Sequence, residues 1–193
     1  MNFRLFNDIH GLAGNAAVDA VMRFSAQYLL FAVGAALAAL LLARLRTDGP
    51  RDAVREALWP AAGLVLSYAL GLLAAAVHPE ARPFTTHPQV HPLIDHHRGQ
   101  AFPSDHSTAA FAIALVVLAF LSRRVGGALL AAAALIGFSR VYVGVHYPGD
   151  VLASLVVALL GVGLVTLARS RTRHDTTTRH LPRPSPLGTH GSR

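Results

Sequence analysis

Long apolar stretches alternate with short polar segments along most of the chain. The apolar stretches are Phe24–Leu45, Ala57–Val77, Ser104–Leu121, Val125–Val143 and Pro148–Ala168. Each comes close to the roughly 20 residues that a helix needs to cross a ~30 Å hydrocarbon core. Their many Ala, Gly and Ser residues suit close packing between helices in lipid. The pattern predicts an all-α, polytopic membrane bundle with five transmembrane helices over residues 24–168.

The two ends of the chain differ from this central part. Within residues 1–20 an irregular apolar stripe runs among Asn, Asp and His residues, and its members are Phe3, Leu5, Phe6, Ile9 and Leu12. The stripe predicts an interfacial amphipathic helix, and the segment lacks the clean apolar run of a secretory signal. Residues 169–193 are rich in Arg, Thr, His and Pro, which predicts a disordered basic tail. The expected membrane domain therefore spans residues 1–168.

Composition supports the membrane interpretation and removes several other classes of protein. Of the 193 residues, 53% are hydrophobic and 14% are charged, whereas about a quarter of a soluble domain is charged. The absence of cysteine excludes disulfides, thiolate metal sites and cysteine nucleophiles. The net charge of +7 comes from arginines at the ends of apolar runs and in the tail. Nucleic-acid binding needs that charge on one soluble face, so topological anchoring explains it better.

The arginines also predict an orientation in the membrane. One predicted side of the bundle collects Arg44, Arg46, Arg51, Arg55, Arg123, Arg124, Arg169, Arg171 and Arg173. Because arginine and lysine accumulate on the inner side of a membrane, this side is expected to face the cytoplasm, together with the tail. The loop His78–Pro103 and the turn Tyr142–Tyr147 are then expected at the outer face of the plasma membrane.

These outward segments contain groups suited to binding phosphate. Arg82 and Arg140 offer planar guanidinium groups that match phosphate oxygens. Cationic residues at a membrane boundary are costly unless they are paired or functional. Ser104 stands where it can cap the third span, whose first backbone N–H groups can bind an anion. The segments therefore predict a phosphate site at the outer face.

A nucleophile and an acid are also present on the same side. His146 and Asp150 are four residues apart at the start of the fifth span, where Pro148 suits the first helical turn. The Asp150 carboxylate can accept a hydrogen bond from one ring nitrogen of His146 and leave the other nitrogen free to attack. His106 is a second titratable group that can protonate a leaving oxygen.

Together these segments resemble a known family. Arg82-Pro83, Pro103-Ser104-Asp105-His106, and Ser139-Arg140 followed by His146 and Asp150 resemble the three motifs of the type 2 phosphatidic acid phosphatase superfamily. The whole chain looks most like the small bacterial undecaprenyl-diphosphatase branch of that superfamily. The resemblance implies an integral membrane hydrolase that needs no metal or other cofactor and releases phosphate from undecaprenyl diphosphate, which recycles a carrier lipid for cell-wall synthesis.

The resemblance also implies a role for each matching residue. His146 is expected to attack phosphorus and form a phosphohistidine, with Asp150 orienting it and His106 protonating the leaving group. The phosphoryl group is expected to be held by Arg82, Ser104, Arg140 and the backbone around Asp105.

The chain departs from the family pattern at two positions. The family's middle motif usually has glycine where Asp105 stands. The family's first motif has a lysine seven residues before the arginine of its Arg-Pro pair; that position is Ala75 here, and the chain has no lysine. Arg98 lies in the same outward loop and is the candidate replacement for the missing cation.

Other interpretations of the sequence stay open at this point. The same motifs suit a phosphatidate or phosphatidylglycerophosphate phosphatase, and a lipid-phosphate-binding or translocating protein without catalysis is an alternative of another class. The outward loop also contains His78, His87, His91, His96 and His97. Their loose spacing and the lack of a thiolate favour solvated loop histidines over a metal site.

Overall fold

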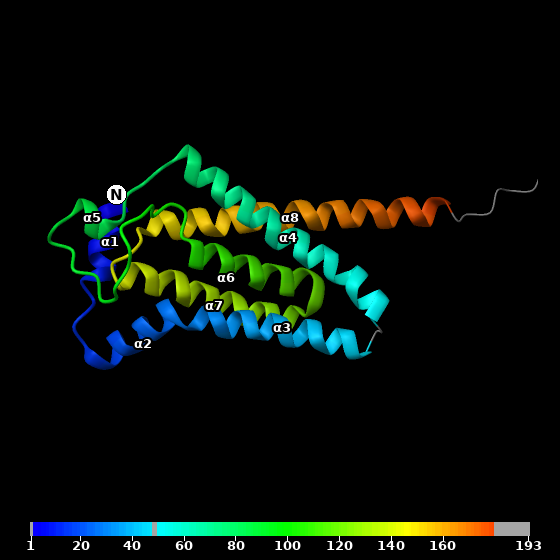
Figure 1. The fold of residues 1–193 in the computed structure, drawn as a ribbon, viewed down its shortest axis with the longest axis horizontal. Coiled ribbons are helices and arrows are strands. Elements are labelled where there is room, and N and C mark those ends of the chain that lie inside the picture. The colour runs from blue at the N-terminus through cyan, green and yellow to red at the C-terminus, as the bar shows by residue number, and fades with distance from the viewer. Residues whose placement is uncertain (1, 48–49, 180–193) are drawn as a thin grey trace, which may run out of the picture.

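The computed structural model describes residues 2–47 and 50–179, and these residues form an elongated helical bundle (Figure 1). The chain order is α1 (Asn2–His10), α2 (Ala16–Gln27), α3 (Leu29–Thr47), α4 (Pro50–Val77), α5 (Pro83–Thr86), α6 (Asp105–Val116), a π-helical turn η1 (Val117–Leu121), α7 (Arg123–Tyr142) and α8 (Pro148–Arg179). The long helices run along the same axis, while α1 and α5 lie at one end of it.

The predicted all-α membrane bundle is confirmed. In the described part of the chain, 4 helices are long and apolar enough to cross a membrane: Leu29–Thr47, Pro50–Val77, Arg123–Tyr142 and Pro148–Thr172. The remaining predicted span corresponds to a shorter apolar helix over Asp105–Leu121. This helix packs against α3, α4, α7 and α8. It is therefore surrounded by the other helices, and its central position explains why most of its residues are buried.

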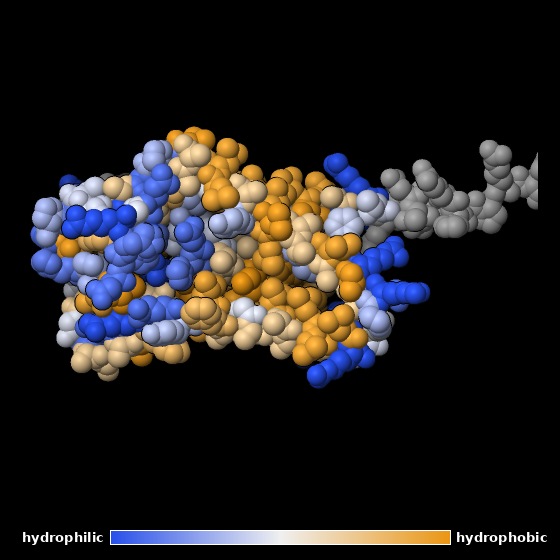
Figure 2. Space-filling model, in the orientation of Figure 1, coloured by the Kyte–Doolittle hydropathy of each residue, from blue (hydrophilic) through white to orange (hydrophobic). Residues whose placement is uncertain are grey.

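The outer surface of the bundle is apolar, as lipid contact requires. Exposed side chains on α4 and α8 include Leu58, Val65, Leu72, Leu152, Val156, Leu160 and Leu164. Figure 2 shows apolar residues over the middle of the bundle and polar residues at its two ends. A surface of this kind on a protein in water would be an association or aggregation site, whereas a bilayer covers it.

The helices α4 and α8 approach each other closely because small residues line their contact. A Cβ atom added at Gly161 would lie 2.3 Å from Ser67 Oγ and 2.6 Å from the Ser67 backbone nitrogen. The Ser67 hydroxyl donates to the Gly63 carbonyl at 2.8 Å, so it stays satisfied inside the helix pair. Close packing of this kind is a main source of helix association in lipid.

The first predicted span, Phe24–Leu45, is divided in the structure. Helix α2 ends at Gln27, where the Tyr28 N–H donates to the Phe24 carbonyl at 2.8 Å, and α3 begins at Leu29. The last carbonyl groups of a helix have no partner within it. Because of this break, the Ala26 carbonyl can accept a hydrogen bond from a side chain elsewhere in the protein, and Arg140 provides it.

The N-terminal helix is present, but its strongest apolar contact is with the protein. Phe6 is fully buried in a cluster with Val90, Val141 and Tyr147, while Leu5 and Leu12 are exposed. Helix α1 thereby covers the turn between α7 and α8. Its position at a membrane interface stays a prediction.

The C-terminal helix is longer than the sequence pattern indicates. The fifth apolar stretch ends at Ala168, but α8 continues to Arg179, so the first part of the expected disordered tail is helical. Arg169 pairs with Glu56 of α4, and the hydroxyls of Ser170 and Thr172 donate to carbonyls three residues earlier. The Arg169–Glu56 pair joins this polar part of α8 to α4. Residues 180–193 of the expected tail lie outside the described residues.

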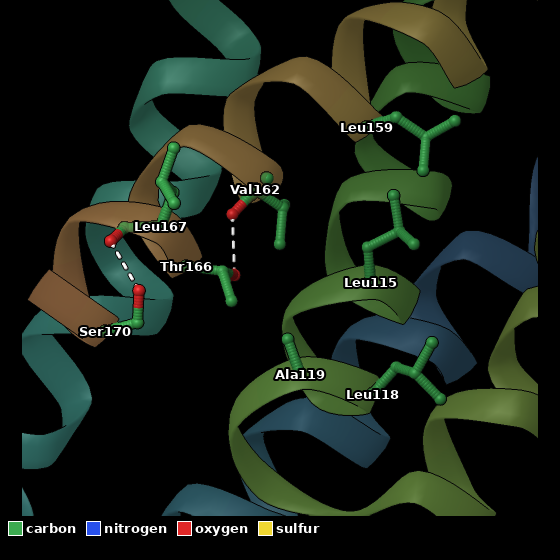
Figure 3. A pocket seen from close by; sticks show the side chains of 9 residues that line it. Leu115, Leu118, Ala119, Leu159, Val162, Thr166, Leu167 and Ser170 are labelled. Atoms are coloured by element: carbon green, nitrogen blue, oxygen red, sulfur yellow. Dashed lines mark hydrogen bonds between the residues drawn. The ribbon is translucent and has the colours of Figure 1, made fainter.

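An apolar groove opens between α6–η1 and α8, near the end of the bundle that is distant from α1. Leu115 and Leu118 lie on one side of it and Thr166 and Leu167 of α8 on the other (Figure 3). The Thr166 hydroxyl donates to the Val162 carbonyl at 2.8 Å, so this hydroxyl is satisfied within its own helix. The groove therefore offers apolar surface but none of the phosphate-binding groups predicted from the sequence.

Candidate active site

The turn between α7 and α8 places His146 in the interior of the polar end of the bundle. Gly144 has a φ of 87°, a conformation that side chains with a Cβ rarely adopt. The N–H groups of Val145 and His146 both donate to the Arg140 carbonyl, at 3.2 and 3.3 Å. His146 is therefore buried at this tight turn.

Asp150 holds one edge of the His146 ring. Its Oδ2 lies 3.3 Å from His146 Nδ1 and accepts the Tyr147 N–H at 2.8 Å. Both side chains are buried. The predicted i, i+4 pair therefore forms, and its carboxylate is oriented by the first turn of α8.

Arg82 holds the other edge of the same ring. Its Nη1 lies 3.0 Å from His146 Nε2 and donates to the Val145 carbonyl at 3.1 Å. Because a guanidinium group can only donate, His146 Nε2 must be the acceptor, and the ring proton is on Nδ1, facing Asp150. Burial lowers the pKa of His146 well below its usual value, and the charges of Arg140 and Arg82 lower it further. The ring is therefore neutral, with the lone pair of Nε2 directed into the site.

Arg82 is itself buried at the start of α5. Its carbonyl accepts the Thr85 hydroxyl at 2.7 Å, which fixes the backbone. Burial lowers the pKa of Arg82, and the negative charges of Asp105 and Asp150 oppose this effect. Arg82 thus connects the outward loop to the α7–α8 turn.

Arg140 is a second buried guanidinium group, supplied by the last turn of α7. Its Nη1 donates to the Ala26 carbonyl at 3.1 Å, which is the group left available where α2 ends. Its Nη2 lies 2.7 Å from His96 Nε2. The Nε atoms of Arg82 and Arg140 are buried and have no hydrogen-bond partner among the described residues. Both arginines therefore keep donor capacity for a ligand.

The beginning of α6 completes this end of the bundle. Ser104 caps the helix, accepting the Ser107 N–H at 3.4 Å, and its own carbonyl accepts the Ser154 hydroxyl of α8 at 3.0 Å. The Ser104 N–H donates to the Asp150 carbonyl at 3.4 Å, so the α6 N-terminus is tied to α8. His106 follows on the first turn, half-buried, and is close enough to Arg140 and Arg82 to experience their charge.

The predicted site residues divide into two groups. Buried together are Arg82, Ser104, Arg140, His146 and Asp150, with His106 half-buried beside them. Asp105 is exposed, although its charge affects Arg82. Arg98 is exposed and takes part in none of the hydrogen bonds or ion pairs found among the described residues. It therefore does not join the cluster in this structure.

His96 is the residue near this cluster that the sequence pattern did not single out from the other loop histidines. The sequence pattern favours solvated histidines throughout the outward loop, but His96 is half-buried and contacts Arg140. The available signal was weak, because adjacent histidines in a loop have no periodicity that distinguishes an inward from an outward side chain. Across the described residues, no group of three or more His, Asp or Glu side chains is arranged to hold a metal ion.

The chain is similar in sequence to one protein family and to several known proteins. The profile of the PAP2 superfamily matches residues 56–173. The chain is 41% identical over 161 residues to undecaprenyl-diphosphatase BcrC of Bacillus subtilis (strain 168), which covers 83% of this chain and 80% of that protein. It is 33% identical over 160 residues to the bacitracin transport permease protein BcrC of Bacillus licheniformis, covering 83% and 73% of the two chains.

A solved structure supports the fold. The crystal structure of Aquifex aeolicus LpxE superposes with a TM-score of 0.68 at 23% identity, covering 86% of this chain and 94% of that one. At this level of identity the likeness concerns the fold alone. The same fold in that protein agrees with the helical bundle described above.

Proposed function

The chain belongs to the PAP2 superfamily, and we propose that it hydrolyses a lipid diphosphate in the membrane. The proposed substrate is undecaprenyl diphosphate, and the products are undecaprenyl phosphate and inorganic phosphate. The similarity to undecaprenyl-diphosphatase BcrC over most of both chains supports this substrate over other lipid phosphates. Release of the monophosphate returns a carrier lipid to cell-wall synthesis.

The observation that carries the proposal is the environment of His146. Its Nδ1 faces the Asp150 carboxylate at 3.3 Å, and its Nε2 accepts from Arg82 at 3.0 Å. A neutral imidazole with an oriented lone pair is the form in which histidine acts as a nucleophile. A protein that only bound lipid phosphate would not need a carboxylate behind this ring.

The chemistry proceeds in two steps. His146 Nε2 attacks the terminal phosphorus, the nitrogen–phosphorus bond forms, and the bond to the bridging oxygen breaks while His106 gives that oxygen its proton. Water then attacks the phosphohistidine, His106 takes a proton from the water, and the nitrogen–phosphorus bond breaks. Inorganic phosphate leaves, and both histidines return to their starting states. General acid–base catalysis of this kind contributes about 10²–10⁴-fold to a rate.

The two arginines supply the electrostatic part of catalysis. Phosphoryl transfer depends mainly on positioning and on stabilising charge on the phosphoryl oxygens. Arg82 and Arg140 are buried, so their charges are screened less than they would be in water. The N-terminus of α6, capped by Ser104, adds backbone N–H donors on a third side.

We also propose that this chemistry takes place at the outer face of the plasma membrane. The arginine-rich ends of α3 and α8 and the start of α4 lie at the end of the bundle that is distant from α1 and α5 (Figure 1). The positive-inside rule assigns the arginine-rich end to the cytoplasm. The substrate headgroup would then enter from the periplasmic or extracellular side.

Phosphate release in detergent, with chelator and without added metal, tests the proposal. Undecaprenyl diphosphate, phosphatidate and phosphatidylglycerophosphate are compared as substrates for the wild type, His146→Ala and the control His91→Gln, whose side chain is exposed. Release from undecaprenyl diphosphate is expected in the wild type and the control but not in His146→Ala. Release only from a glycerolipid overturns the substrate, and activity in His146→Ala overturns the nucleophile. Activity that chelator abolishes overturns the metal-independent chemistry.

A further inference from the structure

The loop between α5 and α6 is held at two points, by the α7–α8 turn and by the segment that precedes α5. The Leu93 N–H donates to the Val143 carbonyl at 2.9 Å, and the Ala101 N–H donates to the Glu80 carbonyl at 2.7 Å. Ile94 is buried in a cluster with Val143 and other residues of that turn. His96 lies between these two attachments, and the first of them holds its segment against the α7–α8 turn.

The ring of His96 faces the phosphate-binding groups. Its Nε2 lies 2.7 Å from Arg140 Nη2, and its Nδ1 lies 3.3 Å from the His97 carbonyl. The rings of His96 and His146 are 6.5 Å apart between centroids and meet edge to face at 82°. Because arginine only donates, His96 Nε2 is an acceptor here and Nδ1 carries the proton. His96 is thus neutral in the free protein, and its lone pair occupies a donor of Arg140.

We propose that His96 is a further phosphate-binding residue that exchanges partners when the substrate arrives. An oxygen of the phosphoryl group takes the Arg140 donor that His96 Nε2 accepts in the free site. His96 then takes up one proton on Nε2 and donates it to a second phosphoryl oxygen. This inference rests on the proposed function, since it adds a binding group to the same site.

The charges around His96 explain why the exchange requires the ligand. The groups that face it are Arg140 of α7, Arg82 before α5, His146 of the α7–α8 turn and His97 of its own loop. Burial first, and then the charges of Arg82 and Arg140, lower the pKa of His96 to about 4. A phosphate dianion between the same groups offsets the positive charges of the two arginines and so raises the pKa of His96. Phosphate binding is therefore coupled to proton uptake at this ring.

The coupling has a definite sign. A group whose pKa is higher in the bound state than in the free state strengthens binding at low pH. This contribution is lost as the pH rises through the pKa of the bound state. A charge-assisted hydrogen bond of this kind is worth roughly tenfold or more in affinity. Protonated His96 would then provide a positive charge at the phosphate site. Arg98 does not provide it, because its side chain is exposed in the structure.

Binding of sulfate tests the inference, because sulfate stays a dianion throughout the pH range used and does not titrate itself. Its dissociation constant is measured between pH 5.5 and 8.5 from the stabilisation of the purified protein against thermal unfolding, which needs no turnover. The variants are His96→Gln, His96→Lys and the control His91→Gln, an exposed histidine of the same loop.

Three results are expected. The wild type and His91→Gln bind sulfate more tightly as the pH falls. His96→Gln binds about tenfold more weakly at pH 6, with a smaller dependence on pH. His96→Lys restores the affinity and keeps it at pH 8.5, because an ammonium group stays charged there.

Two results overturn the inference. The first is that His96→Gln binds sulfate with the same affinity and the same pH dependence as His91→Gln. The second is that His96→Lys binds sulfate no more tightly than His96→Gln at pH 8.5. Lipid hydrolysis by the wild type is assayed in parallel, so that loss of the proposed function is recognised separately from loss of the His96 contribution.

Discussion

Arg82 Nη1 lies 3.0 Å from His146 Nε2, the nitrogen that we propose attacks the substrate phosphorus. The guanidinium group therefore occupies the position that the substrate phosphorus must approach. In the proposed mechanism, a phosphoryl group entering the site would accept hydrogen bonds from Arg82 and draw its donor away from the ring. Substrate binding would then release the nucleophile, which the Arg82 contact holds in a single tautomer in the free protein.

Asp150→Asn is expected to lower kcat by about 10³- to 10⁴-fold, as loss of a tautomer-fixing carboxylate does in histidine-dependent hydrolases. The amide can donate to Nδ1, which would move the ring proton to Nε2 and remove the lone pair that attacks. Phosphate release and the unfolding temperature in detergent measure activity and folding separately. Asp95→Asn, in the exposed loop, is the control. An Asp150→Asn enzyme within tenfold of the wild type contradicts this role.

Arg140→Lys is expected to lower kcat/KM by about 10- to 100-fold, because a lysine cannot present two parallel donors. In the structure Arg140 Nη1 is used by the Ala26 carbonyl and Nη2 faces the site. A single ammonium group can satisfy only one of these partners well. Steady-state kinetics on the lipid substrate provide the measurement. Arg98→Lys should retain wild-type kinetics since Arg98 is exposed, and a large defect there would restore Arg98 as the replacement cation.

The rate should fall towards acid only well below pH 6.5. His146 must be neutral to attack, and burial together with Arg140 and Arg82 lowers its pKa. A lowered pKa keeps the neutral form at lower pH, so the acid limb of kcat/KM moves down from the usual histidine range. A pH profile with its acid limb at or above 6.5, when chemistry limits the rate, is incompatible with this assignment.

Gly161→Leu is expected to destabilise the protein by about 1–3 kcal/mol, the usual cost of overpacking. A Cβ at Gly161 would lie 2.3 Å from Ser67 Oγ, so α4 and α8 would have to separate. Gly163→Leu is the matched control on the same helix, since its Cβ would meet no atom within 4 Å. Thermal unfolding in detergent compares the two. Equal unfolding temperatures would show that the α4–α8 contact can adjust without cost.

Local patterns of the sequence predict a large part of this protein. Apolar runs near 20 residues long predict the bundle because a helix is the structure that satisfies its backbone in lipid. The four-residue spacing of His146 and Asp150 predicts their contact because residues so spaced lie on one face of a helix. Ser104 is identified as a cap for the same reason, since capping depends on neighbours in the chain.

Other features lie beyond local patterns. The break at Tyr28 interrupts an apolar stretch without Gly or Pro at that point, and no periodicity marks it. Its consequence is a tertiary contact, in which the Ala26 carbonyl accepts from Arg140. The burial of Phe6 against the protein is also not predictable from the sequence. An apolar stripe on a short helix does not reveal whether lipid or the α7–α8 turn covers it.

By itself, the sequence determined the helical membrane fold and the pairing of His146 with Asp150, and it predicts the end of the bundle at which the proposed chemistry takes place. Only the tertiary structure decided which basic side chains lie around that pair. Arg82, Arg140 and His96 come from separate segments and meet at His146 through contacts between residues far apart in the chain. Arg98, two residues from His96, stays exposed. The direction of a loop side chain depends on what the loop packs against, and the Leu93–Val143 hydrogen bond that orients this loop is a property of the folded chain.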